Sequence, residues 1–95
     1  MATLEMPRLT GSRLSARQLA EQLPATTMGD CVVLDARQME AASQSFADEL
    51  VVQVFVNRAA STFEVIEPTQ RFARHLLVSA QNLGYADRLK LVARL

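Results

Sequence analysis

Cys31-Val32-Val33-Leu34-Asp35 is a short, continuous apolar run that ends at a carboxylate. Such a run is typical of a central strand that is buried on both faces, as in a parallel sheet. Residues 62–66 alternate between apolar and polar and predict another strand. Residues 88–93 alternate as well, although a short helix is an alternative there. Residues 2–9 predict an edge strand that tolerates Pro7.

Helical periodicity fills the segments between these strands. Residues 13–23 carry apolar side chains three and four positions apart, and Ser15 and Gln18 fit a capping box. Residues 69–83 present a second apolar face, and Gly84 supplies a stop signal. Two helices are therefore expected from spacing alone.

The segment 45–59 lies between these two helices and is ambiguous. Its many β-branched residues favour a strand. Phe46, Leu50 and Val54 nevertheless lie at helical spacing. We expect a helix here, with Ser45 as its N-cap.

The predicted order of elements is β-α-β-α-β-α-β within 95 residues. Strands that alternate with helices imply right-handed crossovers and a mixed, mainly parallel sheet flanked by helices. The length fits one α/β domain over residues 1–95. A chain this short buries only about 60–65% of its unfolded surface, so a partner or a second copy would add stability.

Composition excludes several classes of function. Ten basic residues balance ten acidic ones, so no net charge attracts the chain to nucleic acid or to an anionic membrane. A single cysteine rules out an internal disulfide. No apolar run approaches the roughly 18 residues of a membrane span, and no signal-peptide pattern is present, so we expect a cytoplasmic protein.

The residues for common catalytic and metal sites are too few. The chain holds one histidine, His75, and one cysteine, Cys31, whereas a transition-metal site needs further ligands. A Cys/His dyad is a minor alternative, because Cys31 begins a strand that is expected to be buried. Neither standard glycine-rich phosphate loop occurs. The sequence therefore predicts no enzyme activity, no metal and no cofactor.

Two polar features have two interpretations each. Asp35 ends a parallel strand, where carboxylates line binding crevices, or it braces the loop that follows. Arg71, Arg74 and His75 follow one side of a helix and fit either an acidic ligand or a solvated face. In both cases we prefer the second, structural interpretation.

Val32-Val33-Leu34-Asp35, a short connection and Ser43-Gln44-Ser45-Phe46-Ala47-Asp48-Glu49-Leu50 together resemble the STAS-like family of the DUF4325 type, a domain of unknown function. Members of that family carry a strand ending in Asp-Phe and a Ser-x-Ser-Phe-Ala-Asp-Glu-Leu turn into a helix. Ser12-Arg13 matches the start of their preceding helix. The resemblance covers about residues 10–67, and its Ser-Phe-Ala-Asp-Glu block is the specific part.

That family is similar to the STAS domains of anti-anti-sigma factors. Those domains bind an anti-sigma kinase, which releases them by phosphorylating a serine at the N-terminus of the helix after the central strand. The resemblance implies a small STAS-like fold and a protein partner, either an anti-sigma-like regulator or a histidine-kinase-like ATPase domain. The position of the phosphoserine falls on Gln44 here, between Ser43 and Ser45.

The chemistry of this turn can also be stated without the resemblance. A helix N-terminus stabilises anions, so a phosphate on Ser43 or Ser45 would be held there. Asp48 and Glu49 would repel that phosphate, and such repulsion can separate a docked partner. These two acids are either partner-binding or helix-dipole residues. With Ser45 as the expected N-cap, Ser43 is the freer phospho-acceptor.

Three hypotheses of function follow. The first is a regulatory module that docks a protein partner through residues 43–49 and the following helix. The second is a scaffold that self-associates through an apolar strip formed by Val52, Phe55 and Val56. The third is a small-ligand or nucleotide sensor whose crevice uses Asp35, Gln44 and the same turn.

Overall fold

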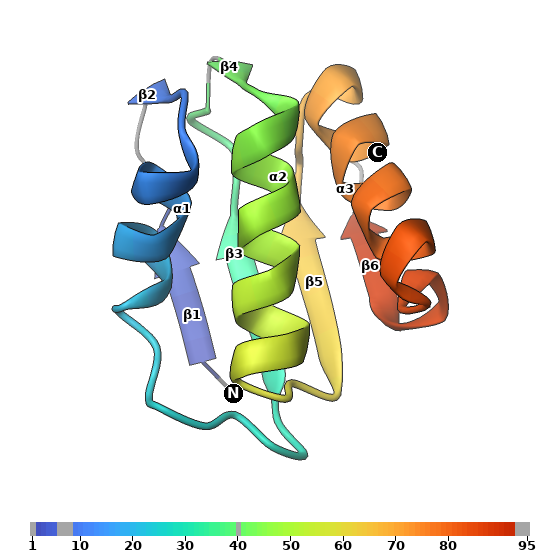
Figure 1. Ribbon diagram of the computed structural model, residues 1–95. Coiled ribbons are helices and arrows are strands. Elements are labelled where there is room, and N and C mark those ends of the chain that lie inside the picture. The colour runs from blue at the N-terminus through green and yellow to red at the C-terminus, as the bar shows by residue number, and fades with distance from the viewer. Residues whose placement is uncertain (1, 6–8, 40, 93–95) are drawn as a thin grey trace.

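The computed structural model describes residues 2–5, 9–39 and 41–92, and it confirms an α/β fold built on a parallel sheet (Figure 1). Its main sheet has the strand order β1-β3-β5-β6, with β1 at Ala2–Glu5, β3 at Cys31–Asp35, β5 at Thr62–Ile66 and β6 at Leu89–Val92. Every pair of neighbours in this sheet is parallel. A further parallel pair joins β2, Leu9–Thr10, to β4, Ala41–Ala42.

Three helices cover one face of the main sheet, as Figure 1 shows. The first, α1, spans Arg13–Ala20, and α3 spans Gln70–Leu83. Between them lies α2, Gln44–Val51, which continues as a π-helix, η1, over Val52–Asn57. A 3₁₀ turn, η2, at Ala86–Arg88 leads into β6. Parallel strands joined through helices on one face are the arrangement expected of right-handed crossovers.

The strand register divides the sheet's side chains between its two faces. Val32 is paired with Phe63, and Leu34 lies between Leu4 and Val65 on the neighbouring strands. All five side chains are fully buried and form the floor of the core beneath the helices. Because strand side chains alternate, the residues between them point to the opposite face.

That opposite face corrects the prediction for the central strand. On that face Val33 is buried, at 8% exposed, whereas Cys31 and Asp35 are half-buried. The prediction of a strand buried on both faces is therefore confirmed for its three central residues and wrong at its two ends, because the helices lie on the other side of the sheet. The apolar run was recognised correctly as the centre of the sheet, where it pairs with β1 and β5.

Side-chain caps start the three α-helices. Ser12, Ser43 and Thr69 each accept a hydrogen bond from the backbone N–H three residues later. The predicted caps Ser15 and Ser45 were wrong, because both residues lie inside their helices. Helix α1 begins three residues before its first buried residue, Ala16, and α2 begins two residues before Phe46.

The remaining boundaries differ little from the predictions. Helix α1 ends at Ala20, short of the predicted end, because Gln22 and Leu23 donate to the carbonyls three residues back and tighten the chain. Gly84 ends α3 with a φ of 82°, as its stop signal predicted. The last segment is a strand and not a helix. Pro7 and Ala93 lie outside the described residues.

No helix in the described ranges is long and apolar enough to cross a bilayer.

Candidate functional site: the first turns of helix α2

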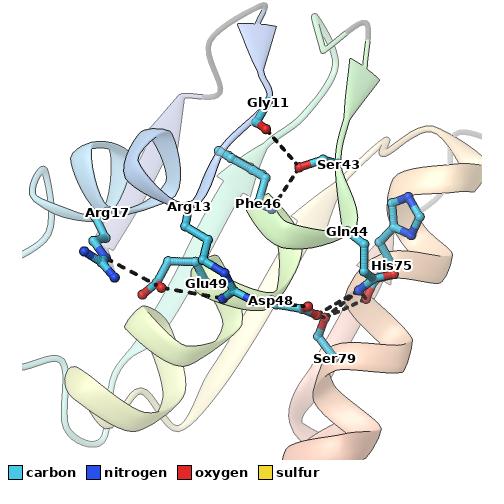
Figure 2. A network of polar contacts seen from close by, with 10 residues as sticks. All are labelled: Gly11, Arg13, Arg17, Ser43, Gln44, Phe46, Asp48, Glu49, His75 and Ser79. Atoms are coloured by element: carbon cyan, nitrogen blue, oxygen red, sulfur yellow. Dashed lines mark hydrogen bonds and ion pairs between the residues drawn. The ribbon is translucent and has the colours of Figure 1, made fainter.

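The turn that leads into α2 is held by one serine hydroxyl. Ser43 Oγ accepts a hydrogen bond from the Phe46 N–H at 3.1 Å and donates one to the Gly11 carbonyl at 3.3 Å (Figure 2). The first contact caps the helix, and the second ties the turn to the segment just before α1. Ser43 is therefore a structural residue and not the freer hydroxyl that the sequence indicated.

Ser45 has the opposite environment. It lies in the first turn of α2, its side chain is exposed, and it makes no side-chain hydrogen bond within the described part of the chain. Its hydroxyl is thus the accessible one of the pair. The order of the two candidate phospho-acceptors is the reverse of the predicted one, because the N-cap lies two residues earlier than expected.

Gln44, at the position of the family's phosphoserine, joins α2 to α3. Its Nε2 lies 2.8 Å from Asp48 Oδ1, 3.0 Å from Ser79 Oγ and 3.1 Å from the His75 carbonyl oxygen. Ser79 Oγ in turn donates to Asp48 Oδ1. These groups form a polar cluster between the two helices, with Ser79 buried at its centre (Figure 2). Gln44 therefore acts as a bridge and not as a free surface group.

The two acids of the turn also have internal partners. Glu49 is nearly buried, and its Oε1 lies 3.6 Å from Arg17 Nε and 3.8 Å from an Arg13 nitrogen. Its other oxygen accepts a hydrogen bond from Gln53 at 2.9 Å. Asp48 Oδ2 lies 3.9 Å from Arg13. Both acids thus serve contacts between helices, and neither of the two predicted roles, partner binding or the helix dipole, is needed to explain them.

Asp35 braces its own turn, as the preferred interpretation held. Its Oδ1 accepts hydrogen bonds from the Arg37 backbone N–H at 3.1 Å and from Arg37 Nε at 2.9 Å, and a guanidinium nitrogen lies 2.6 Å from Oδ2. The hydrogen bonds from the Arg37 side chain and backbone lower the pKa of the Asp35 carboxyl. No contact in the described residues joins Asp35 to Gln44, so the predicted crevice is not formed by these two side chains.

The predicted apolar strip on α2 and η1 is only partly a surface. Phe55 is 3% exposed and stacks on Tyr85, with ring centroids 4.9 Å apart, so its assignment to the interface was wrong. Val56 is 50% exposed, and Val52 is half-buried. Phe55 is buried on the same helix face as Ala47 and Val51, eight and four residues before it. Arg58 N–H donates to the Gln53 carbonyl five residues back, as in a π-helix.

A small pocket lies beside this strip. It has a volume of about 160 Å³ and is lined by residues from α2, η1 and α3: Asp48, Val52, Ser79, Asn82 and Leu83. Its polar end is the cluster around Ser79, and its apolar wall includes Leu83, which is 42% exposed. The site therefore offers a preformed groove with a polar end and an apolar wall, and Val52 in its lining lies four residues before exposed Val56.

Several residues of this site were not found from the sequence. Arg13, Arg17 and Ser79 hold the acids and Gln44 from neighbouring helices, and Leu83 lines the pocket. The only sequence signal was the presence of basic residues on one predicted helix and acidic residues on the next. That signal does not show which side chains pair unless the order of the helices on the sheet is known.

In the part of the chain that the structure describes, no group of three His, Cys, Asp or Glu side chains is placed to hold a metal ion. Searches of protein-family models, of curated proteins and of solved structures found no match to this chain.

Proposed function

We propose that the chain is a non-catalytic regulatory module that docks a protein partner through the first turns of α2 and the exposed side of η1. The observation that supports this most is that Ser45 and Val56 are exposed on one continuous helical element, α2 with η1, that is fixed on both sides. Helix α2 is tied to α1 through Glu49 and to α3 through Gln44. A surface held in this way loses little conformational freedom when a partner binds.

The resemblance of residues 10–67 to the STAS-like family suggests the class of partner. We propose an anti-sigma-like regulator or a histidine-kinase-like ATPase domain, in which the partner supplies any nucleotide and magnesium. The groove lined by Val52, Asn82 and Leu83 would receive an apolar side chain of that partner. Val56 would lie at the same contact, one turn further along.

Ser45 is the residue at which this contact would be regulated. Its hydroxyl is exposed, whereas the hydroxyl of Ser43 is committed to Phe46 and Gly11. A phosphate on Ser45 would lie one helical turn from Asp48 and Glu49, and like charges at that spacing repel. Phosphorylation would therefore weaken docking of an acidic or apolar partner surface.

Site-specific photo-crosslinking in the native cell tests the docking surface. A photoreactive residue is placed at Ser45 or Val56, and at Gln81 on the exposed side of α3 as the matched control. We expect positions 45 and 56 to capture the same protein, identified by mass spectrometry as carrying an anti-sigma-like or histidine-kinase-like domain. Equal capture from position 81 contradicts the docking surface, and a partner of another class contradicts its assignment.

Affinity measurements with the captured partner then test the residues. Ser45→Asp and Val56→Asp should each weaken binding by tenfold or more, because each adds a charge at the centre of the contact. Gln81→Asp adds the same charge elsewhere and should bind as the wild-type chain does. Unchanged affinity for both site variants would exclude this surface.

Self-association through the strip stays a second candidate, in a reduced form. Val56 and Leu83 are both exposed apolar side chains, which would suit an apolar contact between two copies. Phe55 no longer contributes. Sedimentation of Val56→Asp at several concentrations tests it: a wild-type dimer that this variant dissociates supports the strip. The sensor hypothesis has no comparable support, since Arg37 already holds Asp35.

A further inference from the structure

The face of the main sheet opposite the helices is uncovered in the described structure (Figure 1). Parallel sheets almost always have both faces covered, because the helices that connect their strands pack on both sides and the strands are apolar on both faces. Here the open face mixes apolar and charged side chains. The residues that the register places on it are Thr3, Cys31, Val33, Asp35, Thr62, Glu64, Ile66, Lys90 and Val92.

Two rows of this face are self-complementary across β5 and β6. Glu64 on β5 is the register partner of Lys90 on β6, and Ile66 is the register partner of Val92. One row thus sets an acid beside a base, and the row two residues further sets two apolar side chains together. Lys90 and Val92 are exposed, and Glu64 and Ile66 are half-buried. Neither charged side chain of the first row has an ion pair within the described residues.

A two-fold axis turns these rows into matching surfaces. Consider a two-fold axis that is parallel to the strands, midway between two stacked sheets and centred between β5 and β6. With this axis, β5 of one copy lies over β6 of the other. Glu64 then faces Lys90 of the second copy, and Ile66 faces its Val92, with each contact made twice. Stacked sheets of this kind pack about 10 Å apart, a distance that side chains from both faces fill. An isologous contact requires this self-complementary pattern.

We propose that the uncovered face of β5 and β6 is a homodimer interface, occupied by the same face of a second copy. A zero net charge leaves no overall repulsion between two copies. The surface lies on the other side of the sheet from α2, so one copy can dimerise here and dock a regulatory partner there. The inference is independent of the proposed function.

Charge reversal tests both the surface and the symmetry. Sedimentation velocity over a wide concentration range should show a wild-type monomer–dimer equilibrium. Glu64→Lys and Lys90→Glu should each weaken it by tenfold or more, because each creates two like-charge contacts across the interface. An equimolar mixture of the two variants should form a heterodimer, since every contact between positions 64 and 90 then pairs a lysine with a glutamate. The double variant E64K/K90E should dimerise again.

Controls separate an interface effect from a folding effect. Glu21→Lys and Arg74→Glu reverse exposed charges on the helical side, and they should dimerise as the wild-type chain does. Circular dichroism confirms that each variant is folded, and recovery in the mixture cannot come from repair of repulsion within one chain. A wild-type chain that stays monomeric at millimolar concentration overturns the proposal. So does a dimer that resists both reversals, or one that only Val56→Asp dissociates, which would place the contact on η1.

Discussion

At the scale of single residues, the two serines of the α2 turn have different tasks. Ser43 caps the helix, so Ser43→Ala should lower the free energy of unfolding by about 1 kcal/mol, the typical cost of a lost N-cap. Ser45→Ala is the matched control and should change it by less than about 0.5 kcal/mol, because the side chain is exposed and makes no hydrogen bond to the described residues. Urea unfolding followed by circular dichroism measures both. Equal losses in the two variants would contradict the assignment of the cap.

Asp35 gives the turn after β3 a dependence on pH. Hydrogen bonds from Arg37 lower the pKa of its carboxyl in the folded state, so the ionised form stabilises the fold. This contribution is fully present above the unfolded pKa of about 3.9 and is lost as the pH falls through the lower folded value. Asp35→Asn should therefore be less stable than wild type at pH 6, and the difference should shrink toward pH 2. A difference that stays constant over this range would show that charge is not its cause.

The roles of some side chains were predicted correctly from the sequence and those of others wrongly, and the difference depends on whether their partners are close in the chain. Asp35 was expected to brace its loop, and this follows from the known habit of Asp in turns. Ser45 was taken for the cap because cap motifs fix a helix start only to within a few residues. Gln44 bridges α2 to Ser79, thirty-five positions away, and no local pattern contains that contact.

At the scale of elements, α2 is fixed to α1 by a partly exposed ion pair. Arg17 is more than half exposed, whereas Glu49 is nearly buried, so solvent screens the pair. A double-mutant cycle with Arg17→Gln and Glu49→Gln should give a coupling of about 0.5–1 kcal/mol that decreases in high salt. Unfolding of the four chains in urea measures it. A coupling of zero would mean that Arg13 and Gln53 hold Glu49 without help from Arg17.

The π-helix separates core from surface at two adjacent residues. Phe55 packs on Tyr85 and Phe63, so Phe55→Ala should destabilise the fold by about 3–5 kcal/mol, a typical cost for a buried phenylalanine. Val56→Ala should cost less than about 1 kcal/mol, because half of that side chain is already exposed. Thermal and chemical unfolding compare the two. Similar losses would contradict the burial of Phe55 and the exposure of Val56.

This element also marks the limit of periodicity as a guide. Helical spacing overruled β propensity correctly over 45–57, two residues short of the predicted end, because apolar contacts on two sides outweigh a preference of a few tenths of a kcal/mol per residue. The same spacing assumed a regular α-helix throughout. The π-helix at η1 breaks that assumption, although Phe55 is buried on the same face as Ala47 and Val51, where regular spacing also places it.

At the scale of the whole molecule, the alternation of strands and helices predicted the parallel sheet but not the order of its strands. The alternation predicts parallel neighbours and right-handed crossovers, and the sheet is parallel throughout. It does not say which face each helix covers. With the order β1-β3-β5-β6, successive right-handed crossovers proceed in one direction and place every helix on one face. The uncovered face is thus a consequence of topology, which no single segment reveals.

Thermal stability should report this topology through its dependence on concentration. If the open face of β5 and β6 holds a second copy, unfolding and dissociation are linked, and the midpoint of thermal unfolding rises with protein concentration. For a chain of this size the rise should be roughly 3–5 °C for each tenfold increase while the dimer dominates. Glu64→Lys should show a lower midpoint that no longer depends on concentration, whereas E64K/K90E should recover the dependence. A wild-type midpoint that is constant over a hundredfold range would mean that the sheet is stable with one face open to water, and that the helices on the other face supply all of its burial.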